Sequence, residues 1–292
     1  MAVTPPPKVR RLARFRLTTA DIGRLAAFYT QAFGCQQIAD HRLEGDTFRE
    51  LMGVESDARC IKLGLGQDVI ELLEFDIPGR PYPVDTSASA LAFQHFAIVT
   101  ADMTKAWFHL SRMEGWSAIT TGGPRRLPES SGGVTAFKFR DPDGHPLELL
   151  SFRRNHMPRK WRDALGDMLY LGVDHSAISV SDTADSVGFY AALGLGVSTN
   201  SRNVGPEQDA LDGLAHVMVD VTGLVPPSPA PHVELLCYRR EVSARPEVLC
   251  ANDIAATQLV FEGAGTAAPF GLTDPDGHHL LIFPNSDPPR AA

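Results

Sequence analysis

The spacing of hydrophobic and polar residues changes in a regular way along the chain. From Arg14 to Leu17, apolar and charged side chains alternate, which is typical of a strand with one buried face. From Asp21 to Gly34 the apolar residues recur at helical spacing, with Thr19 or Asp21 as the expected cap and the final glycine as the expected stop. The same order of strand, capped helix and closing glycine returns after Leu91 and again after Val173. The pattern therefore predicts a strand–helix unit that is repeated along the chain.

A distinctive phrase, DPDGHPLELLSF, runs from Asp141 to Phe152 and predicts a tight turn followed by a strand. Pro142 pre-sets φ at the first corner of the turn, and Gly144 supplies the left-handed residue that closes a bulged hairpin. The strand is apolar on both faces, so Glu148 within it is costly to bury unless a cation or hydrogen-bond donors meet it. A second copy, DPDGHHLLIF, runs from Asp274 to Phe283, so the chain repeats its own hairpin.

These repeats indicate an α+β fold made of four tandem units of the form βαβββ, joined as two halves. The segment between Gln258 and the second DPDG turn is too short for a helix and two strands, so we expect a truncated fourth unit without its helix. Basic residues between Arg153 and Arg162 are expected to lie on a solvated linker. The predicted bounds are 1–11 for a lead-in, 12–153 for the first domain, 154–170 for the linker, 171–286 for the second domain and 287–292 for a tail.

Composition and charge narrow the class of protein. A chain of 292 residues favours two domains, and 43% hydrophobic with 21% charged residues is ordinary for a soluble globular protein. The net charge of -8, without a basic face of interleaved aromatics, argues against nucleic-acid binding. No apolar run approaches about 18 residues, so we expect no membrane span, and the first residues lack the apolar segment of a secretory signal. The four cysteines form no CxxC motif, so we expect reduced thiols in a cytoplasmic protein.

The order of these motifs resembles that of the vicinal oxygen chelate superfamily. This superfamily includes glyoxalase I, extradiol dioxygenases, fosfomycin-resistance enzymes and bleomycin-resistance proteins. The resemblance rests on a histidine seven residues before an aspartate, on a Phe-Tyr pair in the following helix, and on a glutamate in the strand after DPDGH. The histidine–aspartate pairs are His95 with Asp102 and His175 with Asp182. Over Leu12 to Phe283, the resemblance implies two cupped, mixed β-sheet half-barrels with helices outside, each a glyoxalase-like domain.

The resemblance also implies up to four metal-ligand positions in each cup, two on first strands and two on last strands of the units. In the N-terminal half these positions are Arg14, Glu71, His95 and Glu148. In the C-terminal half they are His175, Glu234, Gln258 and Leu281. Neither half has a full set. We expect the metal at His95, Glu148 and Glu71, with His175, Glu234 and Gln258 as the alternative site, and Glu148 or Glu71 as the catalytic base.

Arg14 departs from the superfamily pattern, because a guanidinium among the ligands would repel a metal ion. Either Arg14 neutralises a buried carboxylate, Glu71 or Glu148, and the site is metal-free, or it points aside and binds an anionic group of the substrate. The second interpretation is favoured slightly. Either histidine could instead be an ordinary core residue. The histidines assigned to turns or the surface are His41, His145, His156, His216, His278 and His279.

The leading functional hypothesis is an enzyme that uses a divalent metal ion (Fe, Mn, Ni or Zn) to act on a small oxygen-rich substrate that chelates the ion. If Arg14 binds this substrate, the substrate is anionic. By resemblance, a lyase or isomerase of glyoxalase type is favoured over a ring-cleaving dioxygenase, because neither half holds two histidines and one glutamate. No glycine-rich phosphate loop, G-x-S-x-G motif or Cys–His pairing suggests a nucleophilic hydrolase.

Two alternatives stay open. The incomplete ligand sets and the short fourth unit suit a non-catalytic protein of bleomycin-resistance type that binds or sequesters a small molecule. The C-terminal half could also be a scaffold that only shapes or dimerises the first half. A small-molecule partner is expected in each case except the last, and a homodimer is left open.

Overall fold

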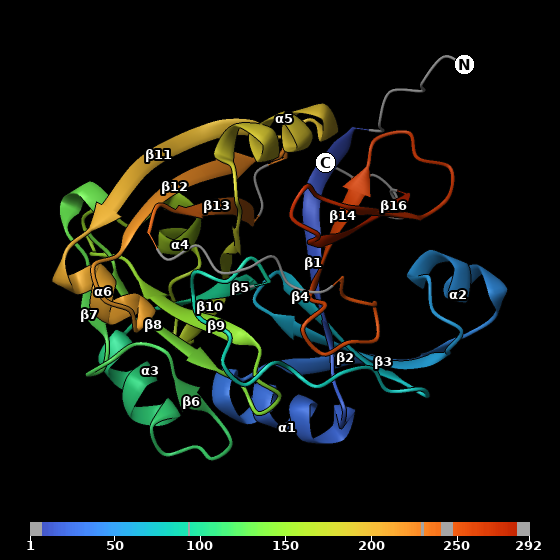
Figure 1. The fold of residues 1–292 in the computed structure, drawn as a ribbon. Coiled ribbons are helices and arrows are strands. Elements are labelled where there is room, and N and C mark those ends of the chain that lie inside the picture. The colour runs from blue at the N-terminus through green and yellow to red at the C-terminus, as the bar shows by residue number, and fades with distance from the viewer. Residues whose placement is uncertain (1–7, 93, 229–230, 241–247, 285–292) are drawn as a thin grey trace.

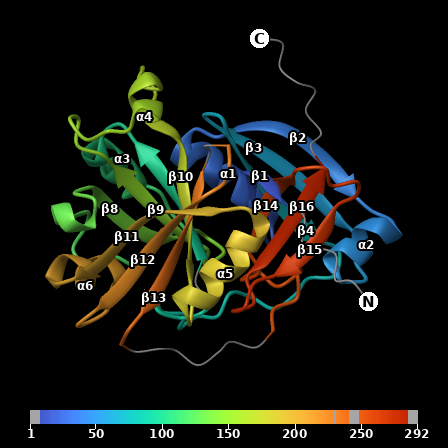
Figure 2. The same ribbon diagram turned by 90° about the horizontal axis from the view of Figure 1, so that it is seen from above.

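Two β-sheets dominate the computed structural model, which describes residues 8–92, 94–228, 231–240 and 248–284 (Figure 1). Within these residues, sheet A has seven strands and sheet B has nine. Sheet A runs, in spatial order, β15 (Phe270–Thr273), β16 (His279–Pro284), β14 (Gln258–Gly263), β1 (Val9–Thr18), β4 (Asp68–Phe75), β3 (Ala58–Leu65) and β2 (Gln36–Leu43). Viewed from above, sheet A lies on the right and sheet B on the left (Figure 2).

Sheet B is the larger sheet and is formed by strands from the middle of the chain. Its spatial order is β11 (Gly196–Val204), β12 (Met218–Val225), β13 (His232–Tyr238), β10 (Tyr170–Ser179), β5 (Gln94–Thr100), β9 (Pro146–Ser151), β8 (Thr135–Arg140) and β6 (Ser117–Ala118), with β7 (Arg125–Arg126) beside β8. The helices of the described chain are α1 (Ile22–Phe33), α2 (Asp46–Met52), α3 (Met103–Leu110), α4 (Arg159–Asp163), α5 (Thr183–Leu193), α6 (Pro206–Asp212) and the 3-10 helix η1 (Glu129–Ser131).

The strand–helix rhythm of the sequence is explained by helix caps. The side chain of Asp21 accepts a hydrogen bond from the backbone nitrogen of Arg24 at 2.9 Å, so Asp21 rather than Thr19 caps α1. Asp102 and Asp182 cap α3 and α5 in the same way. The recurring distance from histidine to aspartate is therefore the length of a first strand and its turn. The fourth unit, described in full over 258–284, contains β14, β15 and β16 without a helix, as expected.

The main hydrophobic core lies on one face of both sheets and includes residues of α1, α3 and α5. Phe15 of β1 and Phe96 of β5 stack within it, with ring centroids 5.1 Å apart. Since successive residues of a strand point to opposite faces, their neighbours Arg14 and His95 face away from the helices, into the two cups. The expected mixed half-barrels with outer helices are thus present.

The strands pair across the predicted halves, and here the expected grouping of units is wrong. β1 of the first unit pairs with β14 of the fourth, and β5 of the second unit pairs with β10 of the third, both antiparallel. Each cup therefore combines one unit from each half. The first strand of one unit can form backbone hydrogen bonds with the first strand of any other unit, so the repeat pattern alone does not predict which strands pair.

Contacts between helices and hairpins still join the two units within each half. The hydroxyl of Tyr29 in α1 donates to Asp141 of the first DPDG turn at 3.1 Å. The hydroxyl of Tyr190 in α5 donates to Asp274 of the second turn at 3.2 Å. The Phe-Tyr pair and the DPDG turn therefore occur together in each half because the tyrosine hydroxyl binds the first aspartate of the turn. The domain bounds at 153 and 171 stay a prediction.

The linker and the chain ends depart in part from expectation. The basic residues between Arg153 and Arg162 are exposed as expected, but Trp161 among them is buried in α4. Strand β1 already begins at Val9, inside the predicted lead-in 1–11, whose residues 1–7 lie outside the described residues together with the tail 287–292. No helix in the described part of the chain is long and apolar enough to cross a membrane.

Candidate metal centre

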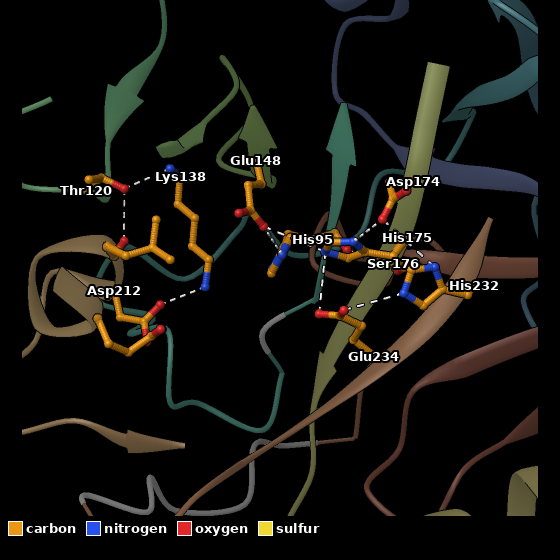
Figure 3. Close-up of polar contacts among 12 residues, drawn as sticks. His95, Thr120, Lys138, Glu148, Asp174, His175, Ser176, Asp212, His232 and Glu234 are labelled. Carbon is orange, nitrogen blue, oxygen red and sulfur yellow. Dashed lines mark hydrogen bonds and ion pairs between the residues drawn. The ribbon is translucent and has the colours of Figure 1, made fainter. Parts of the chain in front are cut away.

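Four of the predicted ligand residues meet on the concave face of sheet B (Figure 3). His95 and His175 lie on the paired strands β5 and β10, and Glu148 and Glu234 lie on the flanking strands β9 and β13. The registers place His95 opposite Ala177 and His175 opposite Ala97, and each glutamate is paired with one of these alanines. The two alanines thus leave room between the four longer side chains, which share one face of the sheet.

The donor atoms of these side chains are close enough to share one ion. Nε2 of His95 lies 3.0 Å from Oε2 of Glu148, and Nε2 of His175 lies 3.7 Å from the same oxygen. Oε2 of Glu234 lies 3.7 Å from Nε2 of His175. One atom each of His95, Glu148 and His175 lies within 4.8 Å of the others. Metal bonds of about 2.1 Å produce separations of this size between neighbouring ligands. These residues could therefore chelate a divalent metal ion.

The charges around the centre also suit a cation. Burial alone would raise the pKa of Glu148, but hydrogen bonds with His175 and His95 hold that pKa well below its usual range. Burial lowers the pKa of His95. Burial would also lower the pKa of His175, yet Glu234, Asp174 and Glu148 raise it well above its usual value. The carboxylates of Glu234, Asp174 and Glu148 surround the imidazole of His175. A divalent ion bound at Nε2 would neutralise part of their negative charge.

Asp174 orients His175, although it was not among the site residues predicted from the sequence. Its Oδ2 lies 3.1 Å from Nδ1 of His175, which leaves Nε2 facing the glutamates. Its Oδ1 accepts a hydrogen bond from Nε1 of Trp161 at 2.9 Å. Burial would raise the pKa of Asp174, but His175 and the other partners lower it to about 2. The sequence held one signal, since Asp174 directly precedes the predicted ligand.

His232 was also missed as a site residue. Its Nε2 lies 3.4 Å from Oε1 of Glu234, and its Nδ1 lies 3.9 Å from Oδ2 of Asp174. Asp174, His175 and His232 form a second group whose donor atoms are close enough to hold an ion. The available signal was strand periodicity, because His232 stands two residues before Glu234 and therefore shares its face of β13.

A cavity of about 430 Å³ opens beside the centre. Its wall carries Lys138, whose Nζ donates to Oδ1 of Asp212 at 2.6 Å. The amide of Gln208 and the hydroxyl of Tyr238 donate to the other oxygen of Asp212 at 2.8 Å and 3.1 Å. Helix α6 ends at Asp212 and so places this carboxylate opposite Lys138 of strand β8 (Figure 3). The cavity thus offers polar groups to an oxygen-rich molecule.

The remaining predicted site residues lie in the other cup. Glu71 is bound by Arg16 and by Arg14, whose Nε lies 3.0 Å from its Oε1, and it belongs to sheet A. The expected grouping of Glu71 with His95 and Glu148 is wrong, because β4 belongs to sheet A. The expected grouping of Gln258 with His175 and Glu234 is wrong for the same reason, since β14 also belongs to sheet A. Arg14 therefore lies outside the metal centre. It neutralises Glu71, the first of its two predicted roles, and not Glu148.

Two histidines assigned to turns or the surface are buried. Nδ1 of His145 lies 2.9 Å from Oδ2 of Asp141, and its Nε2 lies 3.0 Å from the carbonyl oxygen of Ile254. Nε2 of His278 lies 2.8 Å from the carbonyl oxygen of Ser179. Both histidines follow the DPDG turns, as expected, and they attach each hairpin to a neighbouring segment.

Comparisons with known proteins agree with this architecture. Residues 11–149 match the family described as the Glyoxalase/Bleomycin resistance protein/Dioxygenase superfamily. The N-terminal half of the chain therefore resembles this superfamily in sequence. Its fold resembles that of glyoxalase I from Zea mays, with a TM-score of 0.60 and 18% identity over 95% of this chain and 93% of that chain. A putative dioxygenase from Bacillus subtilis gives a TM-score of 0.58 at 10% identity, over 97% of this chain and 87% of that chain. No curated protein matches the sequence significantly.

Proposed function

We propose that this protein is a member of that superfamily and a divalent-metal-dependent enzyme of glyoxalase type, a lyase or isomerase of a small oxygen-rich substrate. The observation that carries the proposal is the convergence of two histidines and two glutamates beside one cavity. Imidazole and carboxylate ligands together suit Fe, Mn, Ni or Zn. The ion would polarise substrate oxygens as a Lewis acid. His95, His175 and Glu148 would hold the ion, and substrate oxygens would bind it from the cavity.

The two glutamates differ in their suitability for proton transfer. Glu148 is buried between both histidines, with a side chain 7% exposed, and is held ionised. The side chain of Glu234 is 24% exposed and is the more accessible from the cavity. We assign to Glu234 the general base, which would remove a proton from the carbon beside the polarised oxygen and return it to the neighbouring carbon. Lys138 and Tyr238 would orient the rest of the substrate.

A ring-cleaving dioxygenase is the second candidate. His95, His175 and Glu148 form a 2-His-1-carboxylate group, the set typical of non-haem Fe(II) oxygenases. Neither half alone contains this set, but β5 and β10 pair across the halves and bring the three residues together, so the expectation against a dioxygenase loses its basis. Glu234 favours the glyoxalase type, because an accessible carboxylate beside the ligand group can serve as the base that proton transfer requires. A non-catalytic binding protein stays the alternative outside enzymology.

Metal content measured by plasma mass spectrometry on untagged protein tests the proposal. Wild type is compared with His95→Ala, His175→Ala and Gln258→Ala, the last being a matched control at the position of His95 in the other cup. We expect about one ion per chain in wild type and Gln258→Ala, and loss in both histidine variants. Wild type that stays metal-free after reconstitution with Fe(II), Mn(II), Ni(II) and Zn(II) contradicts the proposal. Oxygen uptake with catechols would favour the dioxygenase instead.

A further inference from the structure

The cup of sheet A contains a second cavity, of about 400 Å³, which shares no lining residue with the metal centre. Its basic wall consists of Arg14, Arg16 and Lys62, and its apolar wall includes Phe48, Leu51 and Phe283. The rim also carries His41, Arg42 and Glu44. This cavity combines positive charge with apolar surface, whereas the cavity of sheet B holds a carboxylate cluster.

Positive charge exceeds negative charge at the base of this cavity. Arg16 donates to Oε2 of Glu71 through Nε at 2.9 Å and Nη2 at 2.8 Å. Nε of Arg14 and Nζ of Lys62 both approach the other oxygen, at 3.0 Å and 3.2 Å. Burial would raise the pKa of Glu71, but these cations lower it to about 2, so the carboxylate is ionised. The single carboxylate of Glu71 is thus surrounded by three cationic side chains. The excess positive charge is unfavourable in free energy because these groups are partly removed from water.

Arg14 has unused hydrogen-bonding capacity. Nε of Arg14 is buried and makes no hydrogen bond within the described residues, although it lies 3.0 Å from Oε1 of Glu71. A guanidinium carries five N–H groups. Its guanidinium lies over the ring of Phe283, 5.1 Å from the centroid. The side chain is 20% exposed and that of Lys62 is 31% exposed, so both reach the cavity. An oxyanion there could accept hydrogen bonds from both residues.

The strand registers show how this cup differs from the metal cup. Arg14 pairs with Val260, which lies two residues after Gln258. In the same way His95 pairs with Ala177, which lies two residues after His175, so the two side chains of each cup lie diagonally across their strands. Leu281 pairs with Val260, as Glu148 pairs with Ala97. The equivalents of two imidazoles and one carboxylate are therefore a cation, an amide and an alkyl chain. This set repels a metal ion and attracts an anion.

We infer that the cup of sheet A is a binding site for a small organic anion, a carboxylate or phosphate monoester attached to an apolar body. The oxyanion would lie between Arg14 and Lys62, and the apolar part would contact Phe283, Phe48 and Leu51. Arg16 would remain on Glu71. The inference is independent of the metal centre and of the reaction proposed there.

Fluorine NMR titration of the full chain tests this site with 4-fluorobenzoate and 4-fluorophenyl phosphate, and with 4-fluorobenzamide as a neutral probe. The variants are Arg14→Gln and Lys62→Gln, of which the second removes the more exposed charge and endangers folding less. Arg59→Gln is the control, because Arg59 lies on the same strand as Lys62 but pairs with Asp40 outside the cavity. His175→Ala reports whether the probes bind at the metal centre instead.

We expect at least one anion to bind wild type, Arg59→Gln and His175→Ala equally, and to bind Arg14→Gln and Lys62→Gln about tenfold more weakly or worse. The neutral probe should bind wild type no more tightly than the anion binds Arg14→Gln or Lys62→Gln. The tighter of the two anions identifies carboxylate or phosphate as the natural group. The inference is overturned if neither anion binds, if binding is unchanged in Arg14→Gln and Lys62→Gln, or if it is lost in His175→Ala.

Discussion

The imidazole rings of His95 and His175 lie edge to face, with centroids 5.8 Å apart and planes inclined by 70°. They come from the second and third repeat units and meet because β5 and β10 pair antiparallel. The hydroxyl of Ser176 donates to the carbonyl oxygen of His95 at 3.0 Å and adds a contact beside this ladder. The proposed metal centre exists only because these two strands, separated by the linker, lie side by side.

Replacing Asp174 should weaken metal binding without removing a ligand. In Asp174→Asn, Nδ1 of His175 loses its charged acceptor, so the imidazole becomes less basic and less well oriented. We expect a roughly 10- to 100-fold lower metal affinity, measured by competition with a chelator. Trp161→Phe is the control, since it removes only the second hydrogen bond to Asp174 and should have a smaller effect. Unchanged affinity in Asp174→Asn would mean that the aspartate is merely structural.

The two glutamates of the centre should respond differently to mutation. Glu148 lies close to both histidines, so Glu148→Ala should lose the ion. Glu234→Ala leaves the group of His95, Glu148 and His175 intact, so the ion should stay near one per chain while the isomerase or lyase activity disappears. Metal analysis and turnover on the same preparations check this prediction. Equal metal loss in both variants would contradict the assigned base role of Glu234.

Glu71 should make stability depend on acid pH. Its pKa is lowered from 4.5 to about 2 in the folded protein. Its contribution to the free energy of unfolding is therefore complete above the pKa of the unfolded chain and is lost as pH falls from about 4.5 toward 2. Glu71→Gln should cost about 3 to 5 kcal/mol at neutral pH, because three cations lose their carboxylate. The difference from wild type should shrink at about pH 3.

Urea unfolding at both pH values measures this effect. Glu50→Gln is the control, since Glu50 is exposed on α2 and should change stability little at either pH. A cost of Glu71→Gln that stays constant with pH would disprove the role given to its carboxylate.

The buried pair of Lys138 and Asp212 should be coupled. Their side chains are 5% and 0% exposed, so Lys138→Met leaves a buried carboxylate without its cation and should cost about 3 to 5 kcal/mol. The double variant with Asp212→Leu should cost less than the sum of the two single changes. Arg202→Met, at the exposed pair with Asp220, serves as the comparison and should have a small effect. Additive costs in the urea double-mutant cycle would contradict the coupling.

Much of the fold could be read from local patterns. Alternation in β1, the caps at Asp21, Asp102 and Asp182, and the DPDG turns are short-range features, so the sequence located them without knowledge of neighbours in space. Asp174, His232 and the polar wall at Lys138 were missed, because their roles come from strands and a helix that approach only in the folded protein. The cytoplasmic location and the homodimer stay predictions.

The sequence by itself determined the repeat units, because strand and helix periods are local features. Its resemblance to a known superfamily then implied His95, Glu148, His175 and Glu234 as ligand positions, one for each equivalent place in a unit. The tertiary structure decided that these four meet in one cup while Arg14, Glu71 and Gln258 meet in the other. That choice depends on contacts between distant residues, such as Phe15 with Phe96 and Tyr29 with Asp141. Backbone ladders form between any two compatible edges, so only the packing of the whole chain selects the partners.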